Sequence, residues 1–136
     1  MPYDGDVRNF ETLEVRALRA ARDAIAGGWC QGGSGLSDAR GVFVSDFQFD
    51  QATSFCLARA VQKGSYVALG YGCRPPNGGP NQGPIINLQQ QMFQLIAPTV
   101  ANIDVVRWND ADGRTQSEVL AKFDEAISRA SALTEA

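Results

Sequence analysis

The sequence predicts an α+β fold that is mostly helical, with four to five helices and one short β-hairpin. Apolar residues recur at three- and four-residue spacing near both ends of the chain, which is the spacing of one helix face. Between these segments, turn residues precede a β-prone run at 42–49. A chain of 136 residues with 44% hydrophobic content can build one core, so residues 1–136 are expected to form a single domain.

The first helix is expected to follow Asn9, a residue type that caps helices, and to end at Gly27 and Gly28. Its apolar face would contain Phe10, Leu13, Ala17, Ala21 and Ile25. After this helix, residues 38–41 have the composition of a reverse turn. We therefore expect a short hairpin that pairs the region around Trp29 with residues 42–45.

A second helix is expected from Asp50 to about Lys63, with Cys56 on its buried face. The next segment, residues 64–84, contains six glycines and four prolines, a density that opposes regular structure. It is expected to form a loop, and loops of this length in small domains are usually functional or disordered.

Three further helices are expected in the rest of the chain. The first begins at Asn87, and the second spans about 99–108, after a proline at position 98. The last begins at Thr115, which forms a capping box with Glu118 ahead of a regular apolar stripe.

The composition excludes several kinds of chemistry. Histidine is absent, which excludes Ser-His-Asp and Cys-His catalysis and His-ligated zinc. Three cysteines without a CxxC pair argue against both a disulfide framework and a zinc site. We therefore expect no catalytic residues, no metal and no cofactor.

The charge pattern also restricts the partners. The 12 basic and 15 acidic residues are spread evenly along the chain, so a nucleic-acid partner is not favoured. Residues 1–10 do not have the basic and apolar pattern of a secretory leader, and no stretch approaches the roughly 18 apolar residues that a membrane span requires. The protein is expected to be cytoplasmic, with no membrane partner.

The segment WNDADGRT, residues 108–115, resembles a calcium loop in composition only. If its aspartates and glycine are aligned with an EF-hand, the first ligand position falls on Trp108 and the twelfth on Val119, which are both apolar. The segment fits better as a connector between two helices. That role does not require Asp112 or Arg114, which are therefore candidates for a function.

The region 70–96 is the second candidate. Residues 75–103 contain no charged side chain, and a partner can bury such a segment without removing charges from water. Tyr71 and Arg74 lie at its start. The alternative interpretation is a surface loop that covers an ordinary core helix.

Short motifs follow one another along the chain: Gly28-Trp29, Gln31-Gly32, the turn at 38–41, Cys56, Trp108-Asn109-Asp110 and Gly113-Arg114-Thr115. In this order they resemble the motifs of an uncharacterised family of small bacterial and bacteriophage proteins, a domain of unknown function. The resemblance spans most of residues 11–130. It departs from the family at 57–61, where the family has Gly-Ala-Leu, and at 74–84, where this chain is longer. The resemblance implies the fold, a cytoplasmic location and a phage or mobile-element setting, and it implies no mechanism.

Three hypotheses for the function follow. The first is a non-enzymatic interaction or regulatory protein, for example a host-factor or defence-system antagonist, that binds a protein partner through residues 70–96. The second is a small-molecule or nucleotide-binding protein, or a weak enzyme, centred on Trp29, Cys56, Trp108 and Arg114. The third is a homo-oligomer that assembles through the third helix, so that a charge at Met92 or Phe93 would yield a monomer. The candidate binding residues are Trp29, Cys56, Tyr71, Arg74, Trp108, Asn109, Asp110, Asp112 and Arg114.

Overall fold

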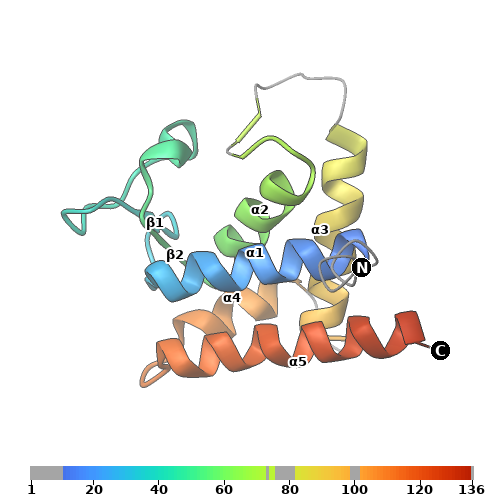
Figure 1. Ribbon diagram of the computed structural model, residues 1–136. Helices are drawn as coiled ribbons and strands as arrows, with labels where there is room; N and C mark the ends of the chain where they lie inside the picture. The colour runs from blue at the N-terminus through green and yellow to red at the C-terminus, as the bar shows by residue number, and fades with distance from the viewer. Residues whose placement is uncertain (1–10, 73, 76–81, 99–101, 136) are drawn as a thin grey trace, which may run out of the picture.

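The computed structural model describes residues 11–72, 74–75, 82–98 and 102–135, with the side chains of all of these except 102, 103, 134 and 135. Within these residues, five α-helices, a 3-10 helix and a two-stranded antiparallel sheet form a mostly helical α+β fold, which confirms the predicted class (Figure 1). In chain order the elements are α1 (Leu13–Gly27), β1 (Leu36–Ser37), the 3-10 helix η2 (Asp46–Gln51), β2 (Ser54–Phe55), α2 (Leu57–Ala68), α3 (Gln82–Ile96), α4 (Asn102–Asp110) and α5 (Gln116–Glu135). None of the described helices has the length and apolar character needed to cross a membrane.

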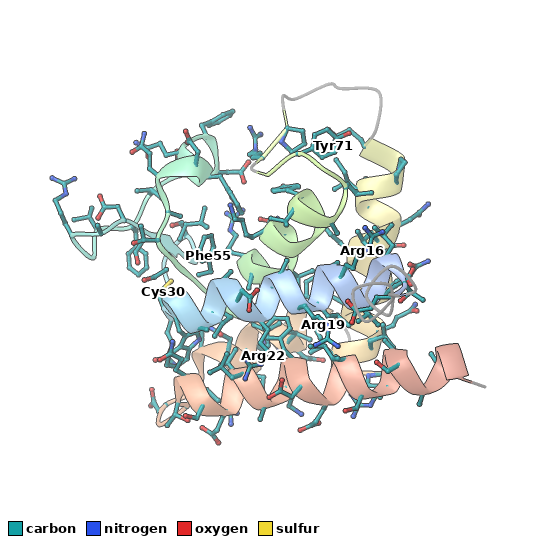
Figure 2. All side chains as sticks on the ribbon, viewed as in Figure 1. Arg16, Arg19, Arg22, Cys30, Phe55 and Tyr71 are labelled. Carbon is teal, nitrogen blue, oxygen red and sulfur yellow. The ribbon has the colours of Figure 1, made fainter. Side chains whose placement is uncertain are left out.

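Helix α1 packs between α2 and α5 (Figure 1). Of its predicted apolar stripe, Ala17, Ala21 and Ile25 are buried and Leu13 is half-buried. Leu18, Ala21 and Ile25 are fully buried. On its other side, Arg22 donates a hydrogen bond to the Asp124 carboxylate of α5 over 2.6 Å (Figure 2). The helix is capped by Thr12, whose hydroxyl accepts from the backbone N–H of Val15, whereas the expected cap Asn9 lies outside the described residues together with Phe10.

The capping box of the last helix is confirmed. The Glu118 carboxylate accepts from the Thr115 backbone N–H over 2.9 Å, and the Thr115 hydroxyl accepts from the Glu118 N–H over 3.2 Å. These bonds satisfy two groups that a helix start leaves without intrahelical partners.

The predicted hairpin partner of Trp29 is wrong. Trp29 forms a parallel bridge with Phe55, and Phe43 forms an antiparallel bridge with Ser37. The reason is local. The Asp38 carboxylate accepts from the backbone N–H groups of Arg40 and Val42, which reverses the chain immediately, so that 42–44 return along 36–38.

The predicted start of the second helix at Asp50 is also wrong. Residues around Asp50 form η2, and the chain then extends through β2, where Ser54 pairs with Ser37. This pairing delays the helix to Leu57, with Cys56 as its capping residue. Sheet pairing therefore overrides the local helix signal.

The loop predicted at 64–84 is shorter at both ends. Helix α2 continues to Ala68, because Gly64 lets it approach α1: a Cβ at this position would lie 2.9 Å from the Cβ of Ala21. Helix α3 begins at Gln82 rather than Asn87, and Pro84 lies in its first turn. A backbone N–H in the first turn has no intrahelical acceptor, so proline at this position costs the helix no hydrogen bond. The fourth helix was expected from Thr99, which lies outside the described residues, and α4 spans Asn102–Asp110.

Candidate functional site

The buried side chain of Asn109, on α4, connects three segments that are far apart in the sequence. Its Oδ1 accepts from the Trp29 indole N–H over 2.8 Å and from the Leu57 backbone N–H over 3.0 Å. Its Nδ2 donates to the Cys30 carbonyl over 3.3 Å and to the Asp110 carboxylate over 2.9 Å. Both donor hydrogens and both acceptor lone pairs of the amide are therefore engaged within the protein.

The same segments are joined by a second set of hydrogen bonds. The Gln31 side-chain amide donates to the carbonyls of Asn109 (2.9 Å) and Ala111 (3.0 Å), and Asp110 accepts from the Gly32 N–H over 3.0 Å. We call these residues, Trp29, Cys30, Gln31, Gly32, Leu57, Asn109 and Asp110, the Asn109 network. The network contains Gly-Trp, Gln-Gly and Trp-Asn-Asp motif residues, and it ties the end of α1 and the start of α2 to the end of α4.

Leu57 shows why this network stabilises the fold. Leu57 is the first residue of α2, so its N–H has no intrahelical acceptor, and the side chain is fully buried. The Asn109 oxygen supplies the missing acceptor from another helix. A buried donor without a partner costs about 1–3 kcal/mol.

Arg114 is held in the connector between α4 and α5. Its Nε donates to the Trp108 carbonyl over 2.8 Å, its NH1 lies 3.3 Å from the Glu118 carboxylate, and its guanidinium carbon lies 3.9 Å from the centre of the Trp108 ring. The guanidinium therefore stacks on the half-buried indole and closes the turn. Asp112 lies in the same turn with an exposed side chain. The connector role therefore explains Arg114 but not Asp112.

Cys56 is buried as predicted, but it caps α2 rather than lying on a helix stripe. Its Sγ accepts from the Arg59 N–H over 3.4 Å, and a Cβ at Gly35 would lie 2.6 Å from the sulfur, so the 32–35 loop covers the thiol directly. Burial raises the pKa of the Cys56 thiol despite the backbone hydrogen bonds that favour the thiolate. Near neutral pH the side chain is a thiol and a weak nucleophile.

Cys30 lies beside Phe55 and behaves in the same way (Figure 2). Burial, followed by the nearby charge of Cys56, raises the pKa of the Cys30 thiol to about 11. Neither described cysteine therefore has the lowered pKa of a reactive thiolate.

Tyr71 and Arg74 lie away from this network, beyond the C-terminal end of α2, and Figure 2 shows Tyr71 well separated from Cys30. Tyr71 is half-buried against the core, and its N–H donates to the Tyr66 carbonyl over 2.8 Å. Arg74 lies 2.9 Å from the Asp46 carboxylate of η2 and 5.2 Å from the ring centre of Phe47. Six of the nine candidate residues thus lie in the Asn109 network or in the connector, and Cys56 caps α2 next to Leu57. Tyr71 and Arg74 lie apart from them, and Arg74 contacts η2.

The described residues of the Asn109 network are not arranged for catalysis or for metal binding. In the described part of the chain, every buried side-chain nitrogen and oxygen has a hydrogen-bond partner. The described residues also contain no group of three metal-ligating side chains. Polar groups that already satisfy one another are not arranged to receive a ligand, so the motif residues of the network have a structural role.

Sequence reasoning identified Asn109, Asp110 and one of their partners, Trp29, but not the other partners. Gln31 and the Leu57 N–H were not candidate residues, because their contacts cross about 50 to 80 residues of chain. The available signal was the presence of the Gly-Trp, Gln-Gly and Trp-Asn-Asp motifs in one sequence. The exposed side chains of Val42, Phe43 and Phe47 had no signal of this kind.

Comparison with known proteins gives one match. A family model described as a family of unknown function (DUF6197) matches residues 11–129. No curated protein and no solved structure matches the chain. The matched residues include all of the candidate residues described above.

Proposed function

The chain belongs to this family of unknown function, and we propose that it is a non-enzymatic interaction protein that binds a protein partner through an exposed apolar surface. The surface lies on residues 38–51, between β1 and β2, which we call the arm. In Figure 1 the arm extends away from the helices. Val42, Phe43 and Phe47 are 52%, 49% and 77% exposed, and we call these three residues the arm surface.

Phe47 is the observation on which the proposal chiefly rests. It lies in η2, where the neighbouring Phe49 is 2% exposed and packs against Phe55 and Tyr66. Phe49 therefore anchors η2 in the core, while Phe47 contributes little to the core. Exposed apolar patches and aromatic side chains are typical of protein-binding surfaces.

Contacts within the chain position the arm. Asp46 accepts hydrogen bonds or ion pairs from Arg59 of α2 and from Arg74, each over 2.9 Å. The Ser45 N–H donates to the Gln48 side chain over 3.0 Å, which fixes the start of η2. A surface that is already ordered loses less conformational entropy when it binds.

The region 70–96 contributes to this proposal mainly through Arg74, which stacks on Phe47. Helix α3 turns Ile85, Leu88, Met92 and Ile96 into the core, and its outward face is rich in glutamine and asparagine. Ile86 is the one large apolar side chain of the described part of α3 that is strongly exposed. The arm therefore offers more apolar contact than α3 does.

Assembly through the third helix stays a prediction, but Met92 is fully buried in the core of its own chain and cannot test it. A charge at this position would unfold the protein instead of producing a monomer. The hypothesis of a small-molecule binder or weak enzyme centred on Trp29, Cys56, Trp108 and Arg114 is weakened, since contacts within the chain engage these side chains.

The setting that we propose is the bacterial cytoplasm, where a protein of bacterial or phage origin acts as a regulator or as an antagonist of a host or defence protein. The motif resemblance supports this setting. The absence of histidine and the raised pKa values of Cys30 and Cys56 favour binding over catalysis.

Site-specific photo-crosslinking tests the proposal. A photoreactive phenylalanine analogue replaces Phe47 in one variant and the exposed Ala121 of α5 in a control variant, and both are irradiated in bacterial cells. We expect a discrete adduct from position 47, none from position 121, and a weaker adduct when Val42→Ser is added. Adducts of equal yield from both positions, or no adduct from position 47, would contradict the proposal.

A further inference from the structure

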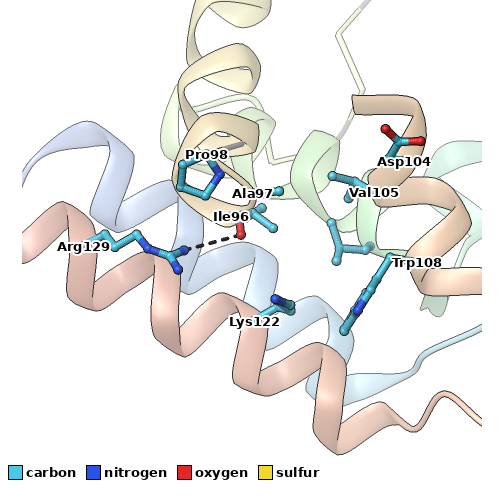
Figure 3. Close-up of a pocket in the computed structure, with 9 residues that line it drawn as sticks. Ile96, Ala97, Pro98, Asp104, Val105, Trp108, Lys122 and Arg129 are labelled. Atoms are coloured by element: carbon cyan, nitrogen blue, oxygen red, sulfur yellow. Dashed lines mark hydrogen bonds between the residues drawn. The ribbon is translucent and has the colours of Figure 1, made fainter. Parts of the chain in front are cut away.

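A pocket of about 300 Å³ opens between α4, α5 and the C-terminal end of α3, away from the arm (Figure 3). Its floor is apolar: Leu57, Ile96 and Val105 line it, and each is at most 3% exposed. The half-buried indole of Trp108 forms one wall. An apolar floor with an aromatic wall is typical of a small-ligand site.

Two cations of α5 lie at the edge of this pocket, and they differ in how firmly they are held (Figure 3). Arg129 is fixed, because its NH1 donates over 2.6 Å to the Leu95 carbonyl in the last turn of α3. Lys122 is held loosely: its ammonium lies 4.0 Å from the Glu125 carboxylate and 5.4 Å from the centre of the Trp108 ring. Lys122 can therefore turn toward a ligand without losing a short ion pair.

The acidic residue at the pocket does not oppose this role. Asp104 lies 3.5 Å from Arg107, one turn along α4, so its charge is partly balanced on its own helix. The pocket therefore combines a floor of buried apolar residues with a positive charge, that of Lys122, which has no short ion pair.

The geometry points to a binding site for a small carboxylate with an apolar body. The body lies on the floor beside the Trp108 indole, and the carboxylate pairs with the Lys122 ammonium. A space of about 300 Å³ is at the lower end of the range of small-ligand pockets, so we take a small ligand of the size of phenylacetate. A cation of the same shape is repelled by Lys122, and an uncharged amide forms a weaker hydrogen bond with it.

NMR of the tryptophan indole N–H groups tests this site with phenylacetate as the probe. Trp29 serves as an internal reference, because its indole N–H is bonded to Asn109 and it does not line the pocket. We expect phenylacetate to shift the Trp108 signal in a saturable way and to leave the Trp29 signal in place. Phenylacetamide and phenethylamine should bind at least about tenfold more weakly.

Three variants make the test specific. Lys122→Met keeps the apolar stem, removes the charge and should weaken phenylacetate binding about tenfold, whereas Lys122→Arg should retain it. Arg40→Met is the matched control, since Arg40 is an exposed cation on the arm, and it should bind as the unaltered protein does. The inference is overturned if Trp108 shows no saturable shift, if the amide binds as tightly as the acid, or if Lys122→Met binds normally. None of these outcomes bears on binding through the arm, because Phe47 and the pocket are separate.

Discussion

Replacing Asn109 with alanine tests whether the motif residues hold the fold together. The substitution removes the acceptor for the Trp29 indole N–H and for the Leu57 backbone N–H, and it removes the donor to the Cys30 carbonyl. Leu57 is fully buried, so its N–H has no access to water as a replacement partner. The substitution also leaves a small cavity at a side chain that is 0% exposed.

The expected loss of stability follows from these groups. Two donors without partners cost about 1–3 kcal/mol each, and the indole, which is only half-buried, falls at the low end of that range. The total is about 3–4 kcal/mol, a large share of the roughly 5–15 kcal/mol that stabilises a domain. For a chain of this length it corresponds to a decrease in Tm of roughly 10–15 °C.

Urea unfolding followed by circular dichroism measures this loss, with Asn87→Ala as the control. Asn87 is an exposed residue of α3, and its substitution should change the free energy of unfolding by no more than about 0.5 kcal/mol. A double-mutant cycle with Trp29→Phe should give a coupling of about 1 kcal/mol between the indole and the amide. A loss below about 1 kcal/mol for Asn109→Ala, or no coupling with Trp29, would refute the structural role of the network.

Two further predictions concern stability. Gly64→Ala should destabilise the protein by about 1–3 kcal/mol, since the added Cβ would lie 2.9 Å from the Cβ of Ala21. The control Gly83→Ala, whose added Cβ would have no atom within 4 Å, should be neutral or slightly stabilising. Equal Tm values for the two variants would contradict the close packing of α1 and α2. Hydrogen bonds from Thr115 and the charge of Arg114 lower the pKa of Glu118 below its usual 4.5, so its stabilising effect is present above that value and is lost as the pH falls through the lowered pKa. Glu118→Ala should therefore lower Tm near neutral pH, and it should lower Tm by much less at a pH well below 4.5. A Tm difference that does not change with pH would show that the carboxylate charge has no part in the cap.

The regular helices could be predicted from sequence because their signals are local. The apolar spacing of α1 and the capping box of α5 depend on residues three or four positions apart. The delayed start of α2 could not be predicted in this way, because it depends on the pairing of Ser54 with Ser37. Gly64 was predicted to lie in a loop for a related reason: its role in α2 depends on the close approach of Ala21 of α1, which lies 43 residues earlier in the chain.

The candidate site was predicted as a set of residues but not as an arrangement. Sequence patterns marked Trp29, Asn109 and Asp110, and the structure brings them together. Their role changed once the partners were known, because every polar atom of the Asn109 amide is engaged inside the protein. The exposure of Phe47 depends on which aromatic residue of η2 the core accepts, and the sequence contains two equivalent phenylalanines there.

Hydrogen exchange measured with and without the partner captured through position 47 tests the central claim most directly. The claim is that the Asn109 network maintains the fold while the arm binds. We predict slower exchange of backbone amides across 42–49 in the complex and unchanged exchange across 108–114. Protection confined to 108–114, or to 82–96, with an unprotected arm would contradict this assignment.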